Sequence, residues 1–201
     1  MNLMDQLNPC QREAVRTTRG PVLILAGAGS GKTRVIIHRI AFLIQEKVPP
    51  SRILALTFTN KAANEMKGRL VEMLGDSGKG VHLSTFHSFG VRILRETIQH
   101  LGYRQNFLIY DTQDQLALIR DLMEDEGLDD SPMIDSKSIY QAIHNAKTHG
   151  YTPEKVLTLN SLPHTQLIGQ FFKRYQKTLK GCNVIDFEDI LKNMLGYINT
   201  F

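Results

Sequence analysis

Residues 22–33 read VLILAGAGSGKT, an apolar run followed at once by a glycine-rich turn. Residues 22–25 contain no polar side chain and are flanked by turn residues, which is typical of a strand buried on both faces of a parallel sheet. Helical periodicity resumes at Lys32 and stops before the proline pair at residues 49–50. This order of strand, glycine turn and helix predicts an α/β architecture.

The turn itself, AGAGSGKT, differs from the phosphate-loop pattern G-x-x-x-x-G-K-T only because Ala26 stands at the first glycine. Glycines allow positive φ angles, so that backbone amides and the helix N-terminus can point at a phosphate. A flexible Gly/Ser turn is the alternative. We expect ATP and Mg²⁺ as ligands, with Lys32 on the β- and γ-phosphates and Thr33 on the metal as the catalytic pair. The predicted nucleotide-binding residues of the loop are Ala26, Gly27, Ala28, Gly29, Ser30, Gly31, Lys32 and Thr33.

Two further pairs of strand and helix are predicted downstream, and a short helix upstream. The upstream helix begins after Asn8, with Pro9 at its first position and Gln11 at the capping-box position. The downstream pairs are a strand at 53–58 with a helix from Thr59 or Asn60 to Leu74, and a strand at 81–84 with a helix at 86–101.

The pattern changes at Thr112, after which we predict helices and no convincing strand up to residue 183. A last helix, DFEDILKNMLGYI, is capped by Asp186. The predicted domains are therefore residues 1–111, an all-helical region at 112–183, and a final segment at 184–201.

Composition narrows the class of protein without naming a ligand. The 201 residues are 42% hydrophobic and 22% charged, with a net charge of +4, which indicates an ordinary globular protein and is compatible with a polyanion partner. The sequence shows neither a signal peptide nor a membrane-spanning run, so we expect a cytoplasmic location. Only Cys10 and Cys182 occur, far apart, so neither a disulfide framework nor a zinc site is predicted.

Five segments resemble, in order and spacing, the start of Rep/UvrD/PcrA-type superfamily 1 DNA helicases: LNPCQREAV, AGAGSGKTRV, LALTFTNKAANEMKGR, STFHSFGVRIL and CNVIDFEDIL. The resemblance implies an incomplete RecA-like domain 1A with a helical insertion 1B. It also implies an ATP-driven translocase that moves 3′ to 5′ on single-stranded DNA and unwinds duplex at single-strand/duplex junctions, in replication or repair. Mg²⁺-ATP would lie between two RecA-like domains, the second supplied in cis.

Two residues outside the loop are expected at the nucleotide. Gln11 matches the family's adenine-reading glutamine, and its side-chain amide offers a donor and an acceptor to a base edge. A capping-box role is the alternative, and both can hold at once. Arg34 matches an arginine that the family places near the nucleotide, although a solvated helix arginine is nearly as good an interpretation.

The family resemblance assigns DNA contacts to the ends of two strands, where open α/β sheets place their ligands. Phe58 can stack on a base, and polar neighbours can reach phosphates. The alternatives are a core role for Phe58, a helix cap for Thr59 and a buried structural role for His87; a metal role for His87 is not expected. The predicted DNA-binding residues are Thr57, Phe58, Thr59, Asn60, Lys61, Thr85, Phe86 and His87.

A basic run in the helical region is a weaker candidate for duplex contacts. Lys173, Arg174, Lys177 and Lys180 fall mainly on one helix face, which more often indicates a solvated surface than a phosphate site.

ATP hydrolysis needs an acidic residue that orients the attacking water. The family places this residue in a DExxD-like motif, which the sequence does not contain. FLIYD, ending at Asp111, is not expected to be catalytic, because Thr112 stands in the place of the usual glutamate and helix-forming residues follow at once. VIDFED, with Asp186, Glu188 and Asp189, is not expected to be catalytic either, because its apolar run is too short and its carboxylates suit the first turn of a helix. We therefore expect a fragment that binds ATP and DNA without hydrolysis or unwinding. The alternatives are a non-hydrolysing binding module and a phosphate-loop kinase.

Overall fold

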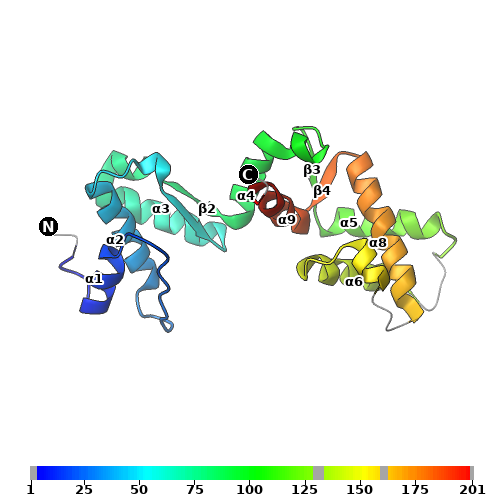
Figure 1. Cartoon of the computed structure of the whole chain (residues 1–201), viewed down its shortest axis with the longest axis horizontal. Coiled ribbons are helices and arrows are strands. Elements are labelled where there is room, and N and C mark those ends of the chain that lie inside the picture. The colour runs from blue at the N-terminus through cyan, green and yellow to red at the C-terminus, as the bar shows by residue number, and fades with distance from the viewer. Residues whose placement is uncertain (1–3, 129–133, 159–162, 200–201) are drawn as a thin grey trace. The chain divides into compact units, whose positions relative to one another are not determined.

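The computed structural model describes residues 4–128, 134–158 and 163–199, and the chain divides into two compact units, Met1–Phe86 and His87–Phe201. Each unit contains a two-stranded parallel sheet with helices packed on it (Figure 1). The coarse prediction of mixed helices and parallel strands is thereby confirmed. The domain limits at residues 111 and 183 rest on the change of sequence pattern at Thr112 and stay a prediction. Within the described residues, no helix is both long and apolar enough to cross a membrane.

The first unit is built around a parallel pair of strands on which helix α3 packs. Strands β1 and β2 align Leu54 with His82 and Thr57 with Thr85. Side chains of α2 and α3 meet in an apolar core that includes Ile37, Ile40, Met66 and Leu70. The elements of this unit are α1 (Pro9–Arg16), α2 (Lys32–Gln45), the 3-10 helix η1 (Pro50–Arg52), β1 (Leu54–Thr57), α3 (Asn60–Leu74), the 3-10 helix η2 (Gly75–Gly80) and β2 (His82–Thr85).

Local sequence signals account for where these helices begin and end. The Asn8 side chain accepts a hydrogen bond from the Gln11 amide, and the Gln11 side chain accepts one from the Asn8 amide, so the predicted capping box is present. The Thr59 side chain caps α3 by accepting from the Ala62 amide at 3.1 Å. Gly75 ends the same helix with a φ of 59°, which glycine adopts without steric cost. The predicted starts of α1 and α3 and the end of α3 are confirmed.

The predicted buried strand at residues 22–25 is wrong. The segment is irregular, and Leu23 and Leu25 are 84% and 87% exposed. A strand exists only through hydrogen bonds to a neighbour, and in the described part of the chain β1 pairs with β2 while nothing pairs with this segment. The apolar side chains of this segment favour burial, but the described residues do not cover them.

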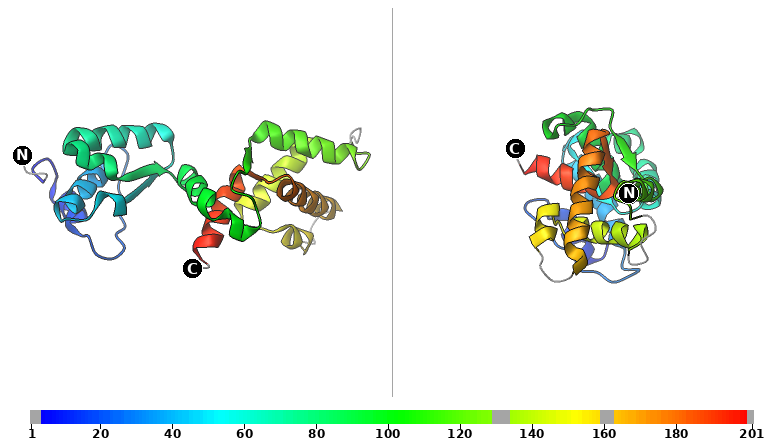
Figure 2. Two further views of the ribbon diagram at one scale, coloured as in Figure 1. Left: turned by 90° about the horizontal axis from the view of Figure 1, so that it is seen from above. Right: turned by 90° about the vertical axis from the view of Figure 1, so that its right-hand side faces the viewer.

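The second unit packs a bundle of helices around another parallel pair, β3 and β4 (Figure 2). Helix α8 contacts α5, α6, α7 and β4, and its Phe171, Phe172 and Tyr175 lie in the apolar core. The elements of this unit are α4 (Phe86–Thr97), which begins at the last residue of the first unit, the 3-10 helix η3 (Ile98–Leu101), β3 (Leu108–Tyr110), α5 (Thr112–Glu124), α6 (Ser136–Thr148), α7 (Pro153–Thr158), α8 (Pro163–Gly181), β4 (Val184–Asp186) and α9 (Phe187–Ile198).

The helices predicted after Thr112 are confirmed, including α9 with Asp186 as its cap. Leu159, the last residue of the predicted TPEKVLTL helix, lies outside the described residues. Strand β4 was not predicted, because three residues are too few to show an alternation of apolar and polar side chains. It exists because Val184, Ile185 and Asp186 align with Leu108, Ile109 and Tyr110 of β3, which lies more than seventy positions earlier in the chain.

A buried ionic network joins the helices of the second unit to β4. The Lys147 ammonium group on α6 donates to the carboxylates of Asp186 and Asp189, the latter at 2.8 Å. Tyr175 of α8 donates its hydroxyl to Asp186 at 3.0 Å, and Gln176 donates to Asp189 at 2.6 Å. Burial raises the pKa of Asp186, and the neighbouring Lys147 charge opposes that rise. Three helices and one strand thus depend on a single buried cation.

Replacing that cation should destabilise the second unit strongly. Lys147→Met leaves two carboxylates buried without their partner, so the free energy of unfolding should fall by about 3–5 kcal/mol. The matched control is Arg69→Met, which removes the half-exposed Arg69–Glu65 ion pair of α3 and should cost less than about 1 kcal/mol. Urea unfolding followed by circular dichroism measures both, and equal small losses would contradict a structural role for the network.

Candidate nucleotide and DNA sites

The glycine-rich turn forms an open loop in front of helix α2. Gly29 and Gly31 adopt φ angles of 73° and 84°, in the left-handed region that other residues rarely enter. Gly31 is the N-cap of α2 and no side chain caps the helix there. The Ser30 hydroxyl donates to the Gly27 carbonyl at 2.8 Å and tightens the turn. The first amides of α2 are therefore left open at the positive end of the helix dipole.

Lys32 and Thr33 occupy the first turn of that helix, and both are exposed. The Lys32 ammonium group donates to the carbonyl oxygens of Ala26 at 3.0 Å and Gly27 at 2.6 Å, so it reaches back across the loop. An ammonium group above open backbone amides makes a site for a polyanion such as a triphosphate. The adjacent Thr33 hydroxyl supplies a hard oxygen ligand of the kind that Mg²⁺ takes. These residues fit Mg²⁺-ATP.

Gln11 fulfils its capping role and also reaches the loop. While its oxygen accepts from the Asn8 amide, its nitrogen donates to the Ser30 carbonyl at 3.0 Å. A Cβ added to Gly31 would lie only 3.0 Å from that nitrogen. The side-chain amide thus caps α1 and also ties that helix to the glycine loop.

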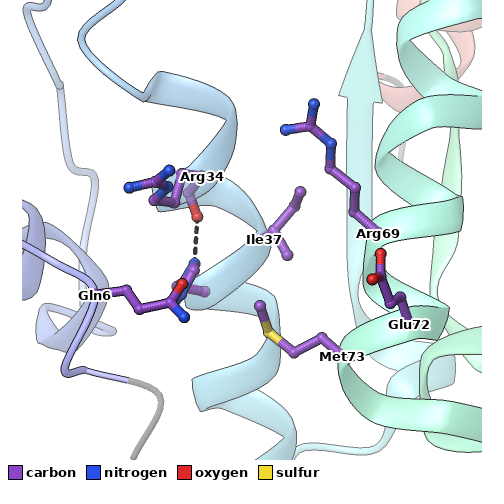
Figure 3. Close-up of a pocket in the computed structure, with 7 residues that line it drawn as sticks. Gln6, Arg34, Ile37, Arg69, Glu72 and Met73 are labelled. Carbon is purple, nitrogen blue, oxygen red and sulfur yellow. Dashed lines mark hydrogen bonds between the residues drawn. The ribbon is translucent and has the colours of Figure 1, made fainter.

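Arg34 is exposed and lies at the edge of a cavity of about 380 Å³ between α2 and α3. Figure 3 shows Arg34 and Ile37 on the α2 wall, with Arg69, Glu72 and Met73 on the α3 wall. The Arg34 carbonyl bonds to the buried imidazole of His38 at 2.8 Å, while its guanidinium group extends from the helix. Arg34, a predicted nucleotide residue, thus contributes to the wall of a cavity beside α2.

The end of β1 presents an exposed aromatic side chain. Phe58 is 90% exposed and its ring centroid lies 5.5 Å from that of Phe86, at the end of β2. The alternative of a core role for Phe58 therefore does not hold. Thr59 does cap α3, as its alternative proposed, and Asn60 and Lys61 point into solvent from the first turn of that helix. The two strand ends together form an aromatic surface with polar neighbours.

The other two residues predicted at the end of β2 differ from Phe86. Thr85 is buried, which leaves its side chain little access to a ligand. His87 is half-buried in the second unit and stacks on Phe187, with centroids 3.8 Å apart and planes 15° from parallel. Burial lowers the pKa of His87, and the charge of Glu188 partly opposes that lowering. Phe187 was missed in the sequence, where it reads only as the first residue of a helix.

The acids considered as hydrolytic candidates serve structural roles. Asp111 caps α5 by accepting from the amides of Gln113 and Asp114 at 2.7 and 2.9 Å. Asp186 and Asp189 are consumed by the Lys147 network. These contacts give Asp111, Asp186 and Asp189 structural roles, and the absence of a catalytic acid among them stays a prediction.

The basic face of α8 is partly neutralised. Arg174 pairs with Asp125 and Glu126, and the Lys180 ammonium group lies 5.6 Å from the centre of the Tyr103 ring. Lys173 and Lys177 point into solvent. These contacts favour the solvated surface over a duplex-binding face.

Comparison with known proteins gives consistent matches. The ATP-dependent DNA helicase PcrA of Staphylococcus epidermidis (strain ATCC 35984) is 45% identical over 195 residues, which is 96% of this chain and 27% of that protein. The protein of the same name from Bacillus subtilis (strain 168) is 46% identical over 190 residues, or 94% of this chain and 26% of the relative. That of Staphylococcus aureus (strain Mu50) is 43% identical over 195 residues, again 96% and 27%. The chain spans about a quarter of the length of these relatives.

The family model described as the UvrD/REP helicase N-terminal domain matches residues 7–200. This range contains the glycine loop, both strand ends and the helices of the second unit. The chain belongs to the UvrD/REP helicase N-terminal domain family.

Proposed function

We propose that this chain is the ATP-binding part of a DNA helicase that moves 3′ to 5′ on single-stranded DNA. The relatives named above are ATP-dependent DNA helicases. The observation that carries the proposal is the open N-terminus of α2 behind two left-handed glycines, with Lys32 reaching across the loop. In the complete protein, a RecA-like domain 1A with a helical insertion 1B would act with further domains in cis at single-strand/duplex junctions during replication or repair.

At the nucleotide, each group has a distinct task. Backbone amides of residues 27–33 would surround the phosphates, Lys32 would neutralise the β- and γ-phosphates, and Thr33 would hold Mg²⁺. Bound Mg²⁺ supplies charge neutralisation at the phosphate oxygens. Gln11 holds the loop in place through Ser30, and its amide lies at the end of α1 nearest the site. Arg34 extends a second positive charge from the same helix.

At the DNA, Phe58 is the predicted stacking platform. Its ring is exposed and is braced by Phe86, so little side-chain motion has to be frozen when a base stacks on it. The exposed Asn60 and Lys61 lie shortly after Phe58 and suit contacts with the phosphates of the DNA. Phosphate contacts do not depend on the base sequence. Such a surface suits a translocase, which must pass over every base.

A non-hydrolysing binding module remains the second candidate for the 201 residues alone. The favouring observation is that Asp111, Asp186 and Asp189 are all engaged in caps or in the Lys147 network. Each of these three acids is therefore already engaged in a structural contact. We infer that the chain binds nucleotide and DNA and depends on the remaining domains for hydrolysis and unwinding.

The nucleotide site can be tested with a fluorescent ATP analogue and Mg²⁺. Lys32→Ala removes a charged donor to the phosphates and should weaken binding by about tenfold to a hundredfold, the equivalent of about 1.5–3 kcal/mol. Lys79→Ala, at an exposed lysine of η2, is the matched control and should bind as the wild type does. Equal affinities for all three proteins would refute the assignment of this loop.

The DNA surface can be tested by fluorescence anisotropy with a labelled oligo(dT). Phe58→Ala should weaken binding by about 1–3 kcal/mol, or roughly fivefold to 150-fold, because one stacked base is lost. Phe58→Tyr keeps the ring and should retain most of the affinity. Affinity should fall as salt rises for all variants. Binding that Phe58→Ala leaves unchanged would exclude Phe58 as a platform.

A further inference from the structure

The cavity between α2 and α3 in the first unit has side chains to which the proposed function gives no role. Its volume of about 380 Å³ lies in the size range of ligand pockets. Arg34 lines one side from α2 and Arg69 lines the other from α3, with Ile37 and Met73 between them (Figure 3). Ile37 is 3% exposed and Met73 is 36% exposed, so the two cationic side chains flank an apolar surface that is partly open to solvent.

Both guanidinium groups keep hydrogen-bond donors for a ligand. The Arg34 carbonyl accepts a hydrogen bond from Nδ1 of the buried His38 at 2.8 Å, which fixes the backbone of this turn. The Arg34 guanidinium group itself bonds to no other residue in the part of the chain that the structure describes. Arg69 pairs through Nη2 with Glu65, one turn earlier on α3, and both side chains are half-exposed. A guanidinium group has five N–H donors in a planar fork, so this pairing leaves several of them open.

The cavity is not uniformly basic, which narrows the class of ligand. Glu72 of α3 also lines it, and so does Gln6 from the segment before α1. Figure 3 shows the two guanidinium groups toward the upper end of the view, and the Gln6 and Met73 side chains toward the lower end. A chain of phosphates would be repelled by the Glu72 carboxylate and has no apolar group to cover Met73. The lining therefore suits a ligand that combines a carboxylate with an apolar group.

We propose that this cavity is a docking site for an acidic segment of a partner protein, in which an apolar side chain lies next to a carboxylate. The carboxylate would take the fork of Arg34 or Arg69, and the apolar side chain would cover Ile37 and Met73. Arginine and methionine are both enriched at protein interfaces, and the unbranched Met73 side chain adapts to the shape of its neighbour. Charge complementarity thus favours this partner. The inference goes beyond the proposed function, which gives Arg69 and Glu72 no role.

The test measures the fluorescence anisotropy of a fluorescein-labelled peptide, GELEELEG, on the complete 201-residue chain. The wild type should bind this peptide, and the affinity should fall as salt rises. A control peptide with glutamine in place of every glutamate should bind at least about tenfold more weakly, because the charge-assisted hydrogen bonds are lost. Equal affinities for the two peptides, or no binding of the acidic one, would overturn the proposal.

Single substitutions locate the peptide on the chain. Arg34→Ala and Arg69→Ala should each weaken peptide binding by about fivefold or more, since each removes a cationic donor. Arg52→Ala is the matched control, because Arg52 is exposed on η1 and does not line the cavity. Glu72→Gln removes a like charge and should strengthen binding by roughly twofold, a gain that loss of folding cannot produce. An equal loss for all three arginine variants would indicate nonspecific charge attraction and would overturn the proposal.

Competition separates this inference from the proposed function. If oligo(dT) displaces the peptide and Arg69→Ala weakens oligo(dT) binding, the cationic side chains belong to the DNA site and the docking proposal fails. If Arg69→Ala and Glu72→Gln change the affinity for the ATP analogue but not for the peptide, the cavity is part of the nucleotide site and the proposal fails as well. Peptide binding in the predicted order, by a chain that binds neither ATP analogue nor oligo(dT), would support the docking site and refute the proposed function alone.

Discussion

Parallel pairing of short strands is the constraint on which the arrangement of both units depends. In the described part of the chain, each of the strands β1 to β4 is followed within three residues by a helix, so the carboxyl end of each strand meets the N-terminus of a helix. That junction needs polar groups, because the first amides of a helix have no partner within it. The side chains of Thr59, Asp111 and Asp186 accept hydrogen bonds from these amides and so cap α3, α5 and α9.

The start of α2, which follows no strand in the described part of the chain, differs from these capped helix starts. In the second unit the polar groups are consumed, since Asp111 closes a capping box and Asp186 is buried against Lys147. In the first unit the N-terminus of α2 has no side-chain cap, and Phe58 stands exposed after β1. Unpaired amides and an exposed aromatic ring do not stabilise the fold, which is why we propose these positions, rather than the carboxylates, as the ligand sites.

Local signals in the sequence were sufficient for most of the fold. The caps at Asn8, Thr59 and Asp186 depend on neighbours within three residues, so they could be predicted and were confirmed. The prediction of a strand at residues 22–25 was wrong, and β4 was missed, for the same reason. A strand forms only with a partner strand, and the local sequence does not reveal that partner. Phe187 was missed likewise, because its stacking on His87 requires α4 and α9 to be in contact.

The candidate site was predictable where a motif specifies backbone shape, and less so where it depends on tertiary contacts. The positive φ angles of Gly29 and Gly31 follow from the loop pattern, whereas burial of Thr85 and the tie from Gln11 to Ser30 do not. The sequence pattern also could not distinguish a core Phe58 from an exposed one. That distinction came from the packing of the first unit.

Hydrogen–deuterium exchange of the 201-residue chain tests the central claim most directly, since it reports on the backbone amides that are said to bind phosphate. We expect a non-hydrolysable ATP analogue with Mg²⁺ to slow exchange at residues 27–34. Oligo(dT) should slow exchange at residues 57–61 and affect the loop less. Unchanged exchange at residues 27–34 with saturating nucleotide would contradict the account.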